Sequence, residues 1–273
     1  MSKVLEDSLM TNAASDLAKM KKMFLLFLIV FVVNLVIPPI ADLSPGSRGW
    51  LLASLFVGGF ALFILWKHKL PAKKLVVLGI ILGVLAGIAM PFSGVVTILT
   101  FLAATRVLEI AEGQVKLLKR PIFISVLLGA VVGVVLGIIN LFLGGASASS
   151  FTFSWEVIVV ALSPGIFEEV AFRLFVYTMI IHVLGKHPEG KRENRWIYVL
   201  MIVPHVFLHL PDLWWPNNSF YLDLGGFISG AVSLSLLFGL PMALLMRRRD
   251  LTSAIITHTV VDLIRFLFLG LPF

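Results

Sequence analysis

The sequence predicts an all-α protein, a polytopic transmembrane helical bundle of about eight or nine spans. Hydrophobic residues make up 59% of the 273 residues and charged residues only 14%. Mean hydropathy is +1.02, which is unlike a soluble globular domain. Apolar runs of roughly 16–28 residues recur along the chain, and this is about the length that an α-helix needs to cross a bilayer.

Nine apolar runs separated by polar breaks are the candidate spans. They are residues 23–40, 50–66, 75–90, 93–110, 122–143, 157–184, 196–210, 225–246 and 251–270. The third and fourth runs are short, and only Pro91 and its neighbours separate them. This pair is expected to form two spans, a re-entrant hairpin or one broken helix.

The basic residues are distributed asymmetrically. Of 22 Lys and Arg residues, 18 lie on alternate connections: the N-terminal segment and residues 67–74, 116–120, 186–195 and 247–249. The opposite connections contain only Arg48. The positive-inside rule therefore places the N-terminus in the cytoplasm and the C-terminus outside, in a multi-pass protein of the cell membrane. The basic residues that give the chain its net charge of +7 flank apolar runs, so the expected partner is the lipid bilayer and not nucleic acid.

Three regions are expected along the chain. Residues 1–22 are polar and resemble a cytoplasmic tail before an uncleaved first span. Residues 23–143 are expected to form the N-terminal transmembrane helices, and residues 155–270 a helical core that carries the chemistry. The chain has no cysteine, which excludes disulfides and thiolate chemistry.

Two adjacent glutamates, Glu168 and Glu169, lie inside the apolar run 157–184. An ionised carboxylate at the bilayer centre costs about 2.5–3.5 kcal/mol on insertion scales, so two of them require compensation or a function. Arg173 follows Glu169 by four residues and can neutralise it across one helical turn. Glu168 then has no partner in its own helix, which makes it a candidate functional residue.

The other ionisable residues of the spans gather at a similar depth. With a rise of about 1.5 Å per residue, His205, His209, His258 and Asp262 all fall between mid-membrane and the cytoplasmic half, as Glu168 does. Each has a structural alternative: Glu169–Arg173 can be a simple ion pair, and His258–Asp262 a simple hydrogen-bonded pair. A purely structural role is less expected for the whole set at one depth.

Three motifs resemble those of the CPBP family, the CAAX proteases and bacteriocin-processing enzymes, which includes the Ras-converting CAAX endopeptidases. Glu168, Glu169 and Arg173 in SPGIFEEVAFR match the first motif. His209 in HVFLH matches the second, although His205 stands where an aromatic residue is usual, so the functional histidine is either His209, which we favour, or His205. His258 and Asp262 in LTSAIITHTVVD match the third. The resemblance covers about residues 155–266 and implies a CPBP-like catalytic core in the last four spans.

The resemblance implies an intramembrane endopeptidase in which Glu168 and His209 activate a water molecule. His258, with Asp262, is expected to stabilise the oxyanion that develops on the peptide carbonyl. Asp262 must then be protonated, or must orient His258 and pair with Arg265. Glu169 and Arg173 are expected to fix the helix and shape the local field. The cavity is expected to open to the cytoplasm.

A metal version of the site is also compatible with the residues. His205 and His209 lie four residues apart, and with Glu168 and His258 they can supply four zinc ligands. The resemblance favours the mechanism without a cofactor, in which His205 is a packing residue.

Two other functions stay open on the sequence. A proton-coupled transporter also uses intramembrane glutamates and histidines, but the paired repeats expected of many transporters are absent. The second of these functions is that of a non-catalytic membrane scaffold or a bacteriocin self-immunity protein. For a protease, the expected partner is a peptide or protein substrate, with or without a lipid modification.

The distribution of basic residues gives a direct test of topology. Tags inserted at residues 186–195 and 247–249 should be cytoplasmic, and a C-terminal tag should be external, as accessibility labelling in whole cells would report. A cytoplasmic C-terminus would contradict nine crossings and favour eight, with residues 75–110 reassigned.

Overall fold

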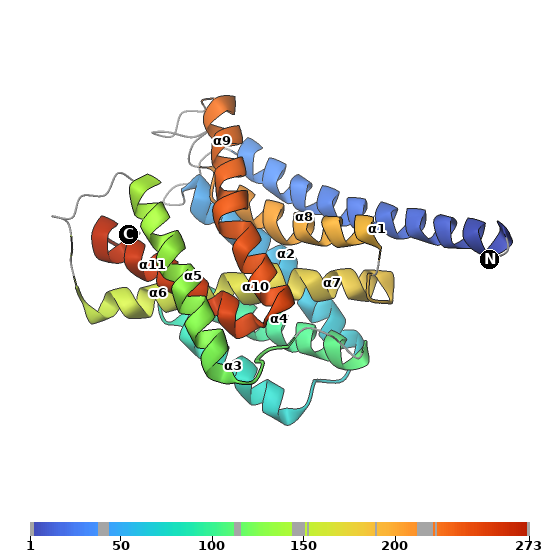
Figure 1. The fold of residues 1–273 in the computed structure, drawn as a ribbon, viewed down its shortest axis with the longest axis horizontal. Coiled ribbons are helices and arrows are strands. Elements are labelled where there is room, and N and C mark those ends of the chain that lie inside the picture. The colour runs from blue at the N-terminus through green and yellow to red at the C-terminus, as the bar shows by residue number, and fades with distance from the viewer. Residues whose placement is uncertain are drawn as a thin grey trace.

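The computed structural model describes residues 3–37, 44–111, 116–143, 151, 153–188, 190–211, 221 and 223–271, with side chains from residue 14 onward. These residues form helices and no strand, which confirms the predicted all-α class. The first five helices are α1 (Lys3–Val36), α2 (Pro45–Lys67), α3 (Lys73–Gly87), α4 (Pro91–Ile110) and α5 (Ile122–Leu143). Figure 1 shows the N-terminal part of α1 projecting beyond the other helices.

The C-terminal half contains three further helical segments before the last helix. The first consists of α6 (Trp155–Glu168), the π-helix η2 (Glu169–Leu174) and α7 (Phe175–Leu184). Helix α8 (Lys191–Phe207) follows. The third consists of α9 (Leu224–Leu234), the π-helix η5 (Ser235–Gly239) and α10 (Leu240–Arg248), and it leads to α11 (Leu251–Leu269).

Each of the nine predicted apolar runs overlaps a helical segment of the described structure, and residues 38–40 of the first run lie outside the described residues. By length and composition, five of the described helices can cross a membrane: Pro45–Lys67, Pro91–Ile110, Ile122–Leu143, Leu224–Arg248 and Leu251–Leu269. Residues 75–110 form two separate helices, α3 and α4, so one broken helix is excluded. The predicted boundary at residue 22 lies inside α1, which continues from the polar segment into the first apolar run. The total number of crossings and their direction stay predictions.

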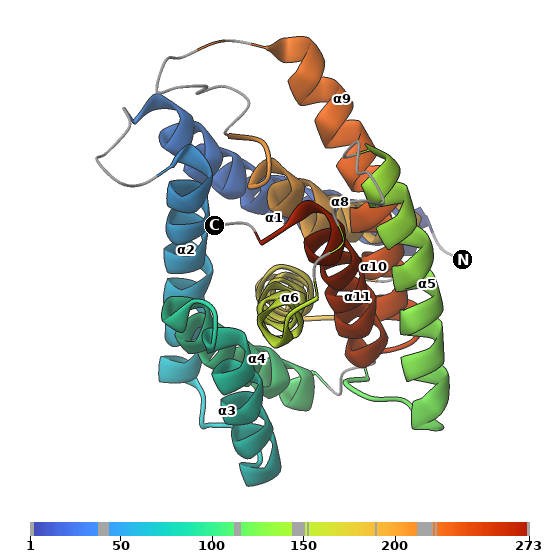
Figure 2. The same ribbon diagram turned by 90° about the vertical axis from the view of Figure 1, so that its left-hand side faces the viewer.

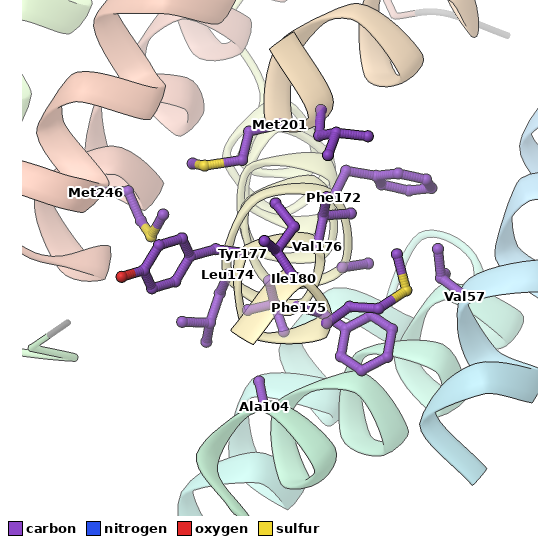
Figure 3. Close-up of a cluster of buried hydrophobic side chains, with 14 of the residues drawn as sticks. Val57, Ala104, Phe172, Leu174, Phe175, Val176, Tyr177, Ile180, Met201 and Met246 are labelled. Atoms are coloured by element: carbon purple, nitrogen blue, oxygen red, sulfur yellow. The ribbon is translucent and has the colours of Figure 1, made fainter. Parts of the chain in front are cut away.

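The segment α6–η2–α7 runs through the middle of the bundle. Figure 2 views α6 end-on, with α2, α4, α8 and α11 around it. All six residues of η2 are buried, as are most residues of α7. Figure 3 shows side chains of this segment, among them Phe172, Phe175 and Ile180, pointing outward toward neighbouring helices. The two glutamates therefore lie on the most enclosed helix of the described structure.

Glycines allow α5 to pack closely against α11. A Cβ atom added to Gly129 would lie 2.7 Å from the Ser253 carbonyl oxygen, and one added to Gly133 would lie 2.9 Å from the Thr257 carbonyl oxygen. These glycines recur every four residues, a spacing that lets helix backbones approach in membranes. The contacts advance along both helices together, so α5 and α11 run parallel. The opposite face of α5 is exposed and apolar, as expected for a surface in contact with lipid.

Asp250 anchors the beginning of α11. Its carboxylate accepts hydrogen bonds from the Ser253 backbone N–H at 2.8 Å, from Ser125 Oγ at 2.5 Å and from the Lys119 backbone N–H at 2.9 Å. An N-terminal aspartate satisfies backbone N–H groups that have no partner inside the helix. The same carboxylate therefore fixes α11 along its axis relative to α5, and with it the position of His258 about two turns further on.

Candidate active site

Local backbone geometry places both glutamates among the histidines. Glu168 ends α6 and Glu169 begins the π-helix η2, in which the Phe175 N–H donates to the Val170 carbonyl oxygen, five residues back. Three residues before Glu168, Gly165 lets α6 pack closely against α11, because a Cβ there would lie 3.1 Å from Thr259 Cα. The crossing of α6 and α11 thus lies beside both glutamates. Single π-turns inside α-helices are frequent at functional sites.

Three histidines surround one oxygen of Glu168. Its Oε2 lies 2.6 Å from His205 Nε2, 3.5 Å from His258 Nε2 and 3.6 Å from His209 Nε2. Glu168 is 6% exposed. The carboxylate that has no partner in its own helix therefore has partners from α11, from α8 and from the turn after α8.

Glu169 forms a second buried cluster beside the first. Its Oε1 accepts from Arg173 Nη1 at 2.5 Å, which confirms the pair predicted from the four-residue spacing, and lies 2.8 Å from His258 Nδ1. Arg173 Nη2 also lies 3.4 Å from His205 Nδ1. His258 therefore bridges the two glutamates, and Arg173 connects Glu169 to His205.

The structure corrects the view of His205 as a packing residue. His205 makes the shortest contact to Glu168, and it is 5% exposed. His209 lies in a turn after α8, which ends at Phe207, and its side chain is 36% exposed. The hydrogen bonds after His205 span three residues, from Leu208 N–H to His205 O and from His209 N–H to Val206 O. This tightened turn brings His209 to the cluster without extending the helix.

Asp262 lies at the edge of the cluster. Its Oδ2 is 3.5 Å from His258 Nε2, one helical turn away. This distance is too long for a strong hydrogen bond. His258 is thus fixed mainly by Glu169 at Nδ1, which leaves its Nε2 directed toward Glu168 and Asp262.

A cavity that opens to the surface reaches the cluster, and its empty space, open solvent included, is about 540 Å³. Its lining includes His205, His209 and His258, together with Asp262 and Arg173. Polar groups from three parts of the chain therefore face one space, which a substrate can occupy.

The ligand atoms of Glu168, His205 and His209 all lie within 4.8 Å of one another. The donor types suit zinc, but two ligands on one tetrahedral zinc lie roughly 3.3 Å apart, given metal–ligand distances of about 2.0–2.1 Å. The Glu168–His205 contact of 2.6 Å is shorter than that. In this arrangement the two groups form a direct hydrogen bond and do not fit around a common ion, so no reaction step is assigned to a metal.

The fold and the cluster define an integral membrane protein with a buried glutamate–histidine centre. Residues 150–264 match the family model described as Rce1-like, type II CAAX prenyl endopeptidase. The match covers less than half of the chain but includes all three motifs, and it agrees with the CPBP/CAAX protease resemblance. It implies a protease of the intramembrane endopeptidase type. No curated protein and no solved structure matches the chain significantly.

Some residues at the site carried no signal in the sequence. The ring of Trp50, from α2, packs edge-on against His205 at 5.7 Å and His209 at 5.1 Å between centroids. Asn140, from α5, lines the cavity. Both belong to the N-terminal helices, outside the range of the motifs, so only the packing of distant helices reveals them.

The buried ion pair gives a stability prediction with a matched control. Arg173→Met should lower the free energy of unfolding by about 3–5 kcal/mol, because it leaves the Glu169 carboxylate buried without its cation. Arg106→Met breaks the half-exposed Arg106–Glu109 pair of α4 and should cost at most about 1 kcal/mol. Thermal unfolding of both variants in detergent checks this, and equal losses would contradict the structural importance assigned to Arg173.

Proposed function

We propose that this protein is an intramembrane endopeptidase that hydrolyses a peptide bond with a water molecule activated by Glu168 and histidine. The observation that carries the proposal is that His209 and His258, from different helical segments, line one cavity, and that Glu168 lies directly behind them, with its Oε2 3.6 Å and 3.5 Å from their Nε2 atoms. The family match supports the same reaction class. Asp262, Glu169 and Arg173 complete the proposed site.

Glu168 is the proposed general base. Its carboxylate takes one proton from water while the water oxygen bonds to the peptide carbonyl carbon and the carbonyl electrons move to oxygen. The hydrogen bond from His205 fixes the Glu168 side chain, and the more exposed His209 accepts a hydrogen bond from the same water. When the oxyanion re-forms the carbonyl, the C–N bond breaks and the amine nitrogen takes the proton from Glu168.

His258 is the proposed stabiliser of the oxyanion. When both ring nitrogens carry protons, Nδ1–H donates to Glu169 and Nε2–H is free to donate to the oxyanion. Glu169 and Arg173 keep the ring in this orientation. Asp262 is either protonated or orients the ring, because an ionised carboxylate beside the oxyanion would oppose its formation.

A cavity that opens to the cytoplasm, as expected from the sequence, constrains the orientation of the helices in the membrane. Asn140, His209 and Arg265 line the cavity at or beyond the carboxyl-terminal ends of α5, α8 and α11. The basic loops predict that these ends lie outside. Cytoplasmic access through this end of the bundle therefore requires the reverse orientation, and the topology tags decide between the two expectations.

The proposed substrates are peptides or proteins that end in a CAAX-type sequence, with lipidation of the cysteine as the property to vary. Purified protein in detergent should cleave such a peptide, prenylated or not, and mass spectrometry would identify the cleaved bond. Glu168→Ala and His209→Ala should abolish cleavage, and His258→Ala should lower the rate by about 10²–10³-fold.

Glu156→Ala removes a glutamate from the first turn of the same helix and serves as the control, because Glu156 is exposed. It should leave cleavage unchanged. Folded Glu168→Ala protein with wild-type activity would exclude the glutamate mechanism. A folded wild type that cleaves no member of the peptide panel would favour the scaffold or transporter alternatives.

A second experiment separates the proposed mechanism from zinc hydrolysis. Chelation should leave activity unchanged, and elemental analysis of active protein should find far less than one metal per chain. His205→Phe should reduce the rate by weakening the orientation of Glu168, without altering metal content. Stoichiometric zinc that is lost in His205→Phe would overturn the mechanism and leave the protease assignment intact.

A further inference from the structure

We propose that Arg265, with Asn140 beside it, binds the free C-terminal carboxylate of the substrate. The inference rests on the proposed protease function. Arg265 is one residue beyond the range that matches the family model, and it belongs to none of the three motifs.

One face of α11 connects the catalytic group to Arg265. His258, Val261, Asp262 and Arg265 all line the cavity, and their spacing of three, four and seven residues places them on one side of the helix. Seven residues of α-helix rise about 10.5 Å. Three residues of extended peptide span about 10 Å. A tripeptide beyond the scissile bond thus reaches from the oxyanion stabiliser His258 to Arg265.

The charges favour Arg265 as the anion-binding group. The other arginine of the cavity, Arg173, is 1% exposed and engaged by Glu169. Arg265 is exposed, and within the described part of the chain no N–O contact within 4 Å joins it to a carboxylate, although Asp262, three residues earlier, is near enough to interact with it electrostatically. A guanidinium binds a carboxylate through two parallel hydrogen bonds. Arg265 therefore offers this geometry to a ligand.

Asn140 brings a second donor to the same level of the bundle. A Cβ added to Gly137 would lie 3.0 Å from Ile264 Cβ, so the two parallel helices are in register at this point. Asn140 follows Gly137 by nearly one turn and lines the cavity with Arg265. Its side-chain amide can donate to a carboxylate oxygen.

Between the two ends the cavity is largely apolar. Leu234, Phe238 and Met242, from the helical segment of η5, face it together with Val261 of α11. These side chains suit two aliphatic residues of a peptide, while Asp262 offers oxygens to backbone N–H groups. An apolar cavity lining that ends at the Arg265 guanidinium matches the chemistry of a peptide with aliphatic residues before its C-terminal carboxylate.

The experiment compares three peptides that differ only at the C-terminus: one with a free carboxylate, one with a terminal amide, and one extended by a residue. Wild-type protein should prefer the free acid. Arg265→Met should lower kcat/KM for the acid by about 10–100-fold, mainly through KM, and should barely affect the amide. Arg265→Lys should restore part of the preference, because it keeps the charge and loses the paired geometry.

Arg106→Met, on α4, is the matched control and should retain the full preference. A structural role for Arg265 near the end of α11 would lower activity on acid and amide equally, and that result would overturn the proposal. So would a wild type that cleaves acid and amide at the same rate.

Binding separates this proposal from the protease assignment. The Glu168→Gln variant, titrated with fluorescent acid and amide peptides, should bind the acid more tightly, and Arg265→Met in that background should remove the difference. Acid-selective binding without any cleavage by the wild type would contradict the protease proposal and support the carboxylate-binding site at Arg265. If the acid does not bind more tightly than the amide, the proposed carboxylate-binding site is wrong, whether or not the protein cleaves peptides.

Discussion

The burial of two adjacent carboxylates in the central helix is the constraint on which the rest of the structure depends. Glu168 is 6% exposed and Glu169 is fully buried, in a segment that hydrophobic neighbours enclose. An isolated charge there would be strongly unfavourable. The surrounding helices therefore supply partners: Arg173 from the same segment, His205 from α8 and His258 from α11. The arrangement of those helices follows from the need to bring these groups together.

The partners also differ in how firmly they are held. Glu169, Arg173 and His258 form contacts between buried groups, whereas the His209 side chain is 36% exposed. Rigid groups suit the stabilisation of developing charge, because no reorganisation is needed when the charge forms. A more exposed imidazole suits exchange of water. A site with a rigid buried part around Glu169, Arg173 and His258, and a solvent-accessible part at His209, is consistent with the proposed hydrolysis.

The sequence alone predicted the features that depend on local composition and periodicity. The helical class, the runs that become helices and the Glu169–Arg173 pair all follow from apolar length and residue spacing. The contribution of His205 was not predictable, because it depends on where α8 ends and how tightly the next turn winds. Trp50 and Asn140 approach the site through tertiary packing, and π-helix η2 differs from an α-helix by a hydrogen-bond register that no residue pattern signals.

The π-helix η2 also changes the phase of the long central segment. A turn that closes through hydrogen bonds five residues apart holds about one residue more than an α-helical turn. The residues that continue one face of α6 along α7 are therefore offset by one position from α-helical spacing. Removing a single residue from Glu169–Leu174 would take away this offset and leave one uniform α-helix, in which the side chains of α7 keep approximately their present neighbours. Removing a residue from within α7 itself would instead turn all later residues of that helix by about 100°.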